Sequence, residues 1–289
     1  MPVEVPWRVA IISQILAVAK GFTELVRALG HQPVGLLFAR RAGDAPRPPQ
    51  AREFLANLLL DAPAELDLVV PRDRTRVAPL LRVLEPDLVL CLGFPWRIPA
   101  EALTVPRLGI VNAHPSLLPR YRGPHPVAWA ARHGEPEIGL TFHRMDEQFD
   151  TGPILAQKPV PLDDDESWET LEPKIAAASA ELLPRVFARL ARGDAGDPQA
   201  AEAATYYSMF GGDELVEIDW SRPSREIHDL VRGWRFAPFT PGERGPLTEL
   251  DGERVRVLRT RLEPGEGRRI ECGDGPLWIV ETEPAQPRG

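Results

Sequence analysis

The fold is decided by the stretch RVAIISQILAVAKGFTELVRALGHQPVGLLF, residues 8–38. Its apolar run at 8–12 predicts a buried strand. The segment from Leu16 to Leu29 predicts a helix ended by Gly30, and 33–38 predicts a second strand. The order of these elements indicates a β-α-β opening, the building block of sheets with parallel strands.

The same alternation of short apolar runs and longer amphipathic segments continues to residue 192. Strands are expected at 66–70, 87–92, 138–144 and 154–160, with a short helix at 77–84. A long helix is expected from Ser167, its N-cap, to Leu190, with a kink at Pro184. The continuous apolar run at 87–92 is typical of a mostly parallel sheet that is covered on both faces.

A change of composition at residues 193–205, rich in Ala, Gly, Asp and Pro, predicts a linker. We therefore expect a catalytic domain at 1–192 and a β-rich domain at 206–289. In the second domain one helix is expected at 224–233. Short strand-like segments occur at 217–220, 247–250, 254–261, 269–272 and 277–281. The turn signals between them favour a small β-barrel or sandwich.

Composition limits the classes of protein that remain. With 289 residues, 43% of them hydrophobic, the chain is able to bury a substantial core. No leader pattern and no apolar run of membrane-spanning length occur, so we expect a soluble, cytoplasmic protein. The net charge of −8 disfavours nonspecific nucleic-acid binding. Cys91 and Cys272 show no partnering pattern, which argues against a disulfide framework and against a zinc motif.

Candidate chemistry lies in the run VNAHPSLLPRYRG (111–123) and in the tetrapeptide DTGP (150–153). Asn112 and His114 are two positions apart at the end of an apolar run, so both project from one face of an extended backbone. Asn112 offers a neutral donor to a developing oxyanion, His114 a proton carrier, and Asp150 a carboxylate that orients the imidazole. This set suits acyl-type transfer through a tetrahedral intermediate. Ser116 lacks the glycine-flanked elbow of a catalytic serine, which favours direct attack by a substrate amine.

Each residue of this set also has an ordinary interpretation when it is taken alone. Asn112 is a frequent turn former, His114 suits a loop, and Asp150-Thr151-Gly152 is an ordinary turn. The combination favours function. The other histidines show no metal-ligand spacing and are interpreted as structural or surface residues, with His125 close enough in sequence to touch an acceptor. These are His31, His125, His133, His143 and His228.

The segments NAHPSLLPRYRG (112–123) and MDEQFDTGPIL (145–155) resemble the signature of the 10-formyltetrahydrofolate-dependent formyltransferases. That family includes methionyl-tRNA, glycinamide ribonucleotide and sugar-nucleotide formyltransferases. The resemblance spans roughly Val9 to Leu190. It implies a Rossmann-like formyltransferase fold with an OB-like, β-barrel-like C-terminal domain, and 10-formyltetrahydrofolate as co-substrate without a metal. It also implies catalytic roles for Asn112, His114 and Asp150.

The resemblance further implies a folate cleft made by two loops, one after the strand ending near Leu92 and one before Asp150. Trp96 equally suits a core position. The implied folate-binding residues are Phe94, Pro95, Trp96, Ile98, Arg144, Met145, Asp146, Glu147 and Gln148. Candidate acceptor contacts are Ser116, Arg122, Gly123 and His125.

The acceptor is inferred from three further features of the sequence. Residues 12–17 lack the glycine-rich loop that glycinamide ribonucleotide enzymes use for a phosphate. The C-terminal part resembles the second domain of methionyl-tRNA formyltransferases and of amino-sugar enzymes. However, residues 206–289 hold 12 arginines, no lysine and 16 acidic residues, a net charge of −4. We expect a small-molecule amine such as an amino sugar or a modified amino acid, with methionyl-tRNA as the alternative.

Arginines 40, 41, 47 and 52 lie near the position of a tRNA-binding loop in the tRNA-directed members, and they equally suit a solvated surface loop. Two other classes also remain open. A formyltetrahydrofolate hydrolase shares the trio, but those enzymes carry an N-terminal regulatory domain, for which a first strand at Arg8 leaves no room. A non-catalytic folate-binding protein is expected to have lost a member of the trio. The oligomeric state does not follow from the sequence.

Overall fold

A computed structural model describes residues 5–39, 56, 59–212, 216–237 and 245–285. The chain divides into two compact units. The first unit comprises Met1–His114, Leu140–Lys158 and Ala176–Ala203, and the second comprises Pro115–Gly139, Pro159–Ile175 and Ala204–Gly289. The domain boundaries at 192 and 206 stay a prediction. The arginines at 40, 41, 47 and 52 lie outside the described residues.

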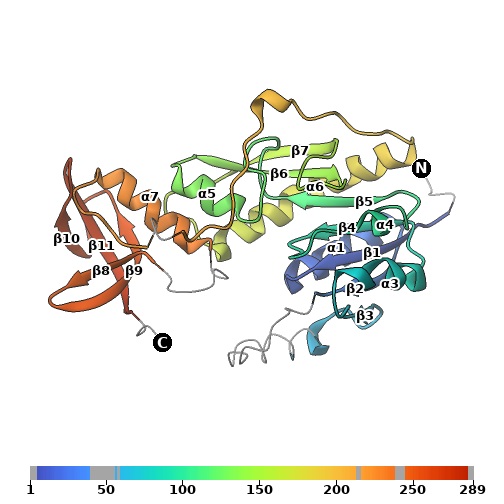
Figure 1. Cartoon of the computed structure of the whole chain (residues 1–289), viewed down its shortest axis with the longest axis horizontal. Coiled ribbons are helices and arrows are strands. Elements are labelled where there is room, and N and C mark those ends of the chain that lie inside the picture. Colours follow the sequence, from blue (N-terminus) through green and yellow to red (C-terminus); the bar gives the residue numbers. More distant parts are fainter. Residues whose placement is uncertain (1–4, 40–55, 57–58, 213–215, 238–244, 286–289) are drawn as a thin grey trace. The chain divides into compact units, whose positions relative to one another are not determined.

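A seven-stranded sheet with the order β3-β2-β1-β4-β5-β6-β7 organises the fold (Figure 1). Its strands are β1 (Arg8–Ser13), β2 (Gln32–Leu37), β3 (Asp67–Val69), β4 (Leu88–Leu92), β5 (Ile110–His114), β6 (Glu137–Arg144) and β7 (Ile154–Pro161). Strands β3, β2, β1, β4 and β5 are parallel, and β6 runs antiparallel to β5. The mostly parallel, Rossmann-like sheet expected from the sequence is confirmed.

The strand order reverses at β1, because β2 lies on one side of it and β4 on the other. Loops at the carboxyl ends of parallel strands form the usual ligand crevice near such a reversal. The two strands at this reversal lie in the core, since residues 9–12 of β1 and 88–90 of β4 have no exposed surface. The apolar runs in these strands therefore reflect burial on both faces.

The chain contains the helices α1 (Leu16–Ala28), α3 (Val77–Leu84), α4 (Ala100–Leu103), α5 (Pro126–Arg132), α6 (Trp168–Ala191) and α7 (Ser224–Arg235), with 3-10 turns η1 (Arg74–Arg76) and η2 (Ala201–Ala203). The helices expected at 16–29, 77–84, 167–190 and 224–233 are all present, and two short helices, α4 and α5, were not predicted. Helix α1 buries Phe22 and Val26, which lie four residues apart on one face. Helix α6 continues past Pro184 to Ala191.

The second unit contains a four-stranded antiparallel sheet with the order β10-β11-β9-β8. Its strands are β8 (Leu247–Leu250), β9 (Glu253–Arg261), β10 (Arg268–Glu271) and β11 (Pro276–Pro284). Residues 217–220 form no strand, and Glu217 makes only a single bridge to Leu247. The small β-rich C-terminal domain is thus confirmed as a small antiparallel sheet.

Candidate active site

Asn112 and His114 lie at the carboxyl end of β5, at alternate positions of the strand. Val111, which precedes them, and Ala113, which lies between them, are buried, with 0% and 2% of their surface exposed. Since side chains alternate along a strand, this burial turns Asn112 and His114 toward the other face. The apolar pattern of the strand therefore sets the direction of both polar side chains.

Asp150 completes the predicted trio from the loop between β6 and β7. Its Oδ1 lies 3.5 Å from His114 Nδ1 and 3.5 Å from Asn112 Nδ2. The side chains of His114 and Asp150 are only 6% and 12% exposed. The backbone of Asp150 adopts a left-handed conformation with φ 57°. The structure therefore brings the three predicted side chains together around one carboxylate oxygen in the first unit.

A fourth side chain, His143 on β6, joins this group. It pairs with Asn112 across the antiparallel β5–β6 register, and its Nε2 lies 3.2 Å from Asn112 Nδ2. Its Nδ1 lies 2.9 Å from the carbonyl oxygen of Arg144. A carbonyl only accepts, so Nδ1 carries the proton and donates, and Nε2 accepts from the Asn112 amide.

Burial lowers the pKa of His143 to about 4, although the carboxylate of Asp150 opposes this shift. The imidazole is therefore neutral at physiological pH, which preserves its acceptor nitrogen. Sequence reasoning interpreted His143 as structural or surface. Its position opposite Asn112 follows from the antiparallel register of β5 and β6, and the spacing of residues along the chain does not reveal that register.

The loop that carries Asp150 is held by hydrogen bonds on several sides. The carboxylate of Asp146 accepts from the Gln148 backbone N–H at 2.9 Å and from the Thr151 hydroxyl at 2.7 Å. Gln199 Nε2 donates to the backbone carbonyls of Asp150 and Gly152, at 2.9 and 2.8 Å. Asp146 and the backbone of Gln148 therefore help to fix the shape of this loop. Contact of these two residues with folate stays a prediction.

The first predicted folate loop presents two aromatic rings. Phe94 and Trp96 are in edge contact, with ring centroids 5.4 Å apart. Both are partly buried against the core of the first unit, as is Met145. Ile98 is only 3% exposed within that core, whereas Pro95 is exposed. Folate contact by these five residues stays a prediction.

Two further predicted folate residues differ in their surroundings. Glu147 is exposed. Arg144 donates to the backbone carbonyls of Leu108, Asp194 and Ala195, at 2.9, 2.9 and 3.1 Å. Burial lowers the pKa of Arg144 from its ordinary value. Its guanidinium thus ties three chain segments together, a structural task that the sequence did not indicate.

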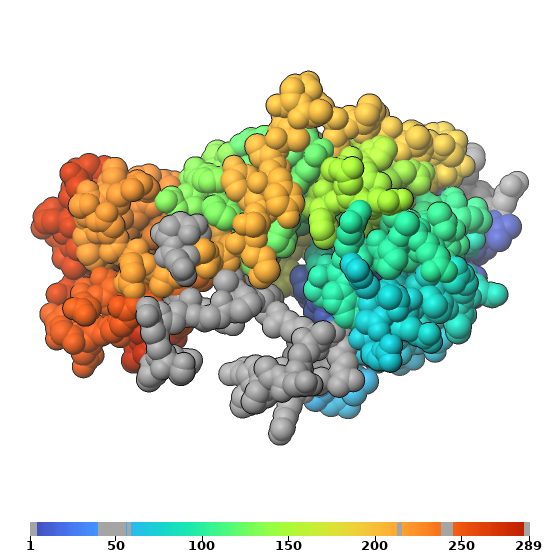
Figure 2. Space-filling view, viewed as in Figure 1, coloured from blue at the N-terminus to red at the C-terminus, as the bar shows by residue number. Residues whose placement is uncertain are grey.

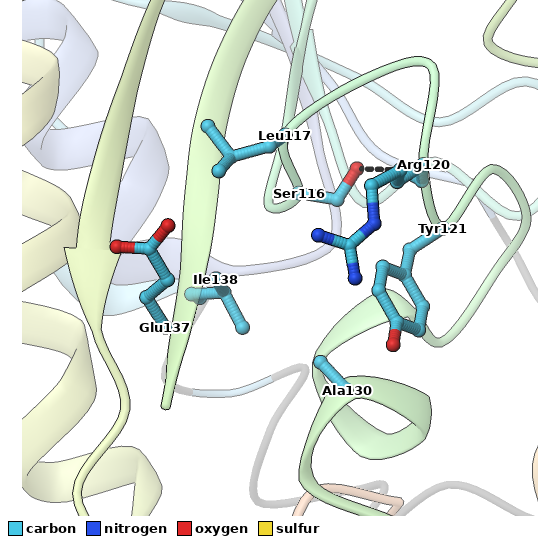
Figure 3. A pocket seen from close by; sticks show the side chains of 7 residues that line it. All are labelled: Ser116, Leu117, Arg120, Tyr121, Ala130, Glu137 and Ile138. Carbon is cyan, nitrogen blue, oxygen red and sulfur yellow. Dashed lines mark hydrogen bonds between the residues drawn. The ribbon is translucent and has the colours of Figure 1, made fainter. Parts of the chain in front are cut away.

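The predicted acceptor residues all belong to the second unit. Ser116 donates from Oγ to the carbonyl of Arg120 at 2.8 Å, at the edge of a small cavity (Figure 3). That cavity is lined by Ser116, Leu117, Arg120, Tyr121, Ala130, Glu137 and Ile138. His125 Nδ1 accepts from the Phe210 N–H at 3.1 Å, and burial lowers the pKa of His125.

The remaining two acceptor candidates, Arg122 and Gly123, lie where the backbone of residues 122–123 passes close to that of residues 206–207. Gly123 has φ 113°, and a Cβ there would lie 2.0 Å from the Tyr207 carbonyl oxygen, so only glycine fits. Arg122 bridges to Tyr206. Contact of these four candidates with an acceptor stays a prediction.

Neither a metal site nor a membrane span is found where the structure describes the chain. Among those residues no group of three or more His, Cys, Asp or Glu side chains is placed to hold a metal ion. Cys91 is buried, and desolvation raises its pKa to about 12. Within the same residues no helix has the length and apolar character needed to cross a bilayer.

Comparison with known proteins agrees with this geometry. Residues 70–187 match the formyl transferase family, and residues 213–288 match the formyl transferase C-terminal domain. The methionyl-tRNA formyltransferase of Pelobacter propionicus is 35% identical over 215 residues, which cover 70% of this chain and 66% of that protein. That of Pseudomonas putida strain W619 is 37% identical over 216 residues, covering 70% of this chain and 67% of its own length.

Among solved structures, WlaRD, a sugar 3N-formyl transferase crystallised with dTDP and 5-N-formyl-tetrahydrofolate, superposes with a TM-score of 0.65. The match covers 96% of this chain and 98% of WlaRD at 17% identity, a level that shows a shared fold. The chain belongs to the formyl transferase family. It spans about two thirds of the length of the curated relatives that it matches. The family resemblance seen in the sequence is confirmed.

Proposed function

We propose that this chain transfers a formyl group from 10-formyltetrahydrofolate to a primary amine. One observation carries the proposal: Asn112 and His114 each place a nitrogen 3.5 Å from the same Asp150 oxygen. An amide donor, an imidazole and a carboxylate at one point are the groups that acyl transfer through a tetrahedral intermediate requires. No covalent protein intermediate is needed, because the acceptor amine is itself the nucleophile.

Bond making and breaking follow from these positions. The acceptor nitrogen forms a bond to the formyl carbon, and the bond from that carbon to the folate nitrogen then breaks. His114 in its protonated form and an N–H of Asn112 stabilise the negative charge on the formyl oxygen. Asp150, through ordered water, helps to move the proton from the acceptor amine to the departing folate nitrogen.

The hydrogen bonds of Asn112 indicate which N–H serves the oxyanion. Its bond to His143 Nε2 measures 3.2 Å, whereas its contact with Asp150 measures 3.5 Å, at the limit for a hydrogen bond. The N–H toward Asp150 is therefore the more weakly held of the two. His143 fixes the plane of the amide through the first N–H, and the second N–H, which points toward Asp150, is the one offered to the formyl oxygen.

The residues around the site suit a reduced pterin carrier. Phe94 and Trp96 offer partly exposed aromatic surface, and the 145–148 loop offers backbone donors and acceptors next to Asp150. When bound, 10-formyltetrahydrofolate supplies the activated formyl group. The described residues hold the acyl oxygen and move the proton without a metal.

For the acceptor we propose a small-molecule amine such as an amino sugar or a modified amino acid. Eight arginines of the C-terminal part form ion pairs with acidic side chains of the second unit, which leaves little net positive field for a nucleic-acid backbone. These pairs are Arg222–Glu226, Arg225–Asp164, Arg232–Asp229, Arg254–Glu217, Arg256–Glu283, Arg259–Glu281, Arg268–Asp251 and Arg269–Glu271. The overall charge of −4 over residues 206–289 agrees.

Methionyl-tRNA is the second candidate acceptor. The relatives with 35% and 37% identity are both named methionyl-tRNA formyltransferases, and the aligned region covers 70% of this chain. The net negative charge described above concerns residues 206–289, and other surfaces are available for phosphate contacts. The two acceptors are separated by experiment.

The test follows tetrahydrofolate release from 10-formyltetrahydrofolate, without amine, with nucleotide-linked amino sugars, with free amino acids and with methionyl-tRNA. Release that depends on a small amine supports the proposal, and release only with methionyl-tRNA supports the second candidate. Release without any amine indicates a hydrolase. No release in any arm indicates a folate-binding protein.

Variants test the roles in the same assay. Asn112→Ala and His114→Ala are each expected to lower turnover about 100-fold to 1,000-fold, the usual cost of a lost oxyanion donor. His31→Gln serves as a control, because this buried histidine precedes β2 at the amino end of the strand, away from the carboxyl end where His114 lies. Near-normal turnover of a folded His114→Ala protein would remove His114 from the mechanism.

A further inference from the structure

We propose that Gln199 is a positioning residue that holds Asp150 in its catalytic orientation, so that the segment after α6 is part of the active-site framework. This inference rests on the proposed function, since it assigns to Gln199 a role in that reaction. Sequence reasoning assigned residues 193–205 to a linker. Within this segment, residues 194–199 have a defined set of partners in the first unit.

The side-chain amide of Gln199 spans the turn that carries Asp150. Its Nε2 donates one hydrogen bond to the carbonyl of Asp150 at 2.9 Å and another to the carbonyl of Gly152 at 2.8 Å. An amide nitrogen has two hydrogens, so this geometry uses both. The two carbonyls belong to the residues before and after Thr151. Because both bind the same nitrogen, Gln199 restrains the distance between them.

Asp150 has a conformation that needs such support. At φ 57° it lies in the left-handed region, which costs free energy for any residue with a Cβ. Asp146 holds the same turn from the inside through the Thr151 hydroxyl. Gln199 binds the carbonyl oxygen of Asp150 and therefore restrains the backbone of that residue. A rotation of this backbone would move the carboxylate away from His114.

The segment that carries Gln199 is itself anchored. Asp197 and Ile154 exchange two backbone hydrogen bonds of 2.8 Å, which tie the segment to the start of β7. Arg189 on α6 pairs with Asp194 and with Asp197, both at 2.7 Å. Arg144 adds bonds to two carbonyls of the segment.

Close packing reinforces this anchoring. Gly196, at φ 95°, approaches so closely that a Cβ there would lie 2.9 Å from Pro153 Cβ and 3.0 Å from the Ile154 carbonyl oxygen. The segment after α6 lies on the molecular surface (Figure 2), and it is attached to the rest of the first unit through residues 194–197. The backbone near Gln199 is therefore held in place, so the hydrogen bond from its side chain restrains the position of Asp150.

The experiment compares Gln199→Ala and Gln199→Glu with Gln157→Ala. Gln157 is the control in the first unit, because its Nε2 donates at 2.7 Å to the side-chain hydroxyl of Thr141 on β6. Gln199→Ala is expected to lower kcat/KM about 10-fold to 100-fold, since displacements near 1 Å at a reacting group have costs of this size. Gln199→Glu is expected to lose at least as much, because its carboxylate faces two carbonyl oxygens.

A double-mutant cycle separates positioning from a general loss of stability. If Gln199 acts through Asp150, Gln199→Ala in an Asp150→Ala background changes kcat/KM by no more than about two-fold. The same large loss in both backgrounds would overturn the proposal. An Asp150→Ala protein with normal activity would instead count against the proposed catalytic trio, so the two failures are distinguishable.

Hydrogen exchange provides a readout that needs no activity. In Gln199→Ala the amides of residues 146–152 are expected to exchange faster than in the wild type, while those of β1 and β4 stay unchanged. Gln157→Ala is expected to leave the 146–152 peptide unchanged. Equal exchange of this peptide in wild type and Gln199→Ala would show that Gln199 does not hold the turn.

Discussion

Replacing Gly152 by alanine would place a Cβ 1.9 Å from the carbonyl oxygen of Arg144 and 2.9 Å from its carbon. Ordinary contact begins near 3.4 Å, so the two backbones must separate by about 1.5 Å. That carbonyl also accepts from His143 Nδ1 at 2.9 Å. The substitution therefore disturbs both the turn of Asp150 and the bond that sets the tautomer of His143.

The expected loss follows from this displacement. Overpacking of a closely built site costs about 1–3 kcal/mol, which corresponds to a decrease in Tm of roughly 2–12 °C for a domain of this size. A shift of about 1 Å at Asp150 is expected to lower kcat/KM on the order of 100-fold. Tetrahydrofolate release measures the rate, and thermal unfolding measures the stability.

The control is Gly21→Ala in α1, where a Cβ meets no atom within 4 Å. There alanine is expected to raise stability by up to about 1 kcal/mol, because it favours helix, without changing the rate. A Gly152→Ala protein with the Tm and kcat/KM of the wild type would show that the close approach at Arg144 relaxes at no cost. The reasoning from the turn to Asp150 would then be refuted.

Three further predictions follow. Because burial lowers the pKa of His143 to about 4, its contribution to stability is present above pH 6.5 and is lost as the pH falls toward 4. Urea unfolding should show a smaller decline over this range for His143→Gln, and an unchanged decline would contradict the assignment. Arg144→Gln, which removes bonds to three carbonyls, is expected to lower the free energy of unfolding by about 2–4 kcal/mol; a raised KM for 10-formyltetrahydrofolate at unchanged stability would instead mark Arg144 as a substrate contact. Cys91, whose pKa is raised to about 12 by burial, should react with a disulfide reagent at pH 8 only after unfolding, whereas Cys272 is partly exposed and reacts earlier; rapid modification of native Cys91 would contradict its burial.

Much of the fold was accessible from local sequence patterns. The short helix at 77–84 has the bounds that its apolar spacing predicted, and Gly30 follows the end of α1 in a left-handed conformation. These features depend on burial periodicity and on turn chemistry, both of which are written along the chain. The prediction of a strand at 217–220 was wrong: the segment pairs with β8 through a single bridge between Glu217 and Leu247, and its apolar residue Ile218 is buried outside a regular strand.

The candidate site divides in the same way. Asn112, His114 and Asp150 were predicted as a group because a strand places alternate residues on one face and because a long motif surrounds them, and the structure places them together. The position of His143 opposite Asn112 was not predicted, since it depends on the antiparallel register of β6. Arg144 was expected at a ligand, but its guanidinium bonds to carbonyls at 108, 194 and 195, partners that no local pattern specifies.

By itself, the sequence determined the alternation of strands and helices and the family, and it predicted three candidate groups of the site, because each is recorded in short-range spacing or in a contiguous motif. Only the tertiary structure decided that His143 orients Asn112 and that residues 194–199 lie against β7, with Gln199 on the Asp150 turn. These contacts join residues 31 to 49 positions apart in the chain. Their geometry depends on sheet register and on the packing of a whole unit, which no single stretch of sequence contains.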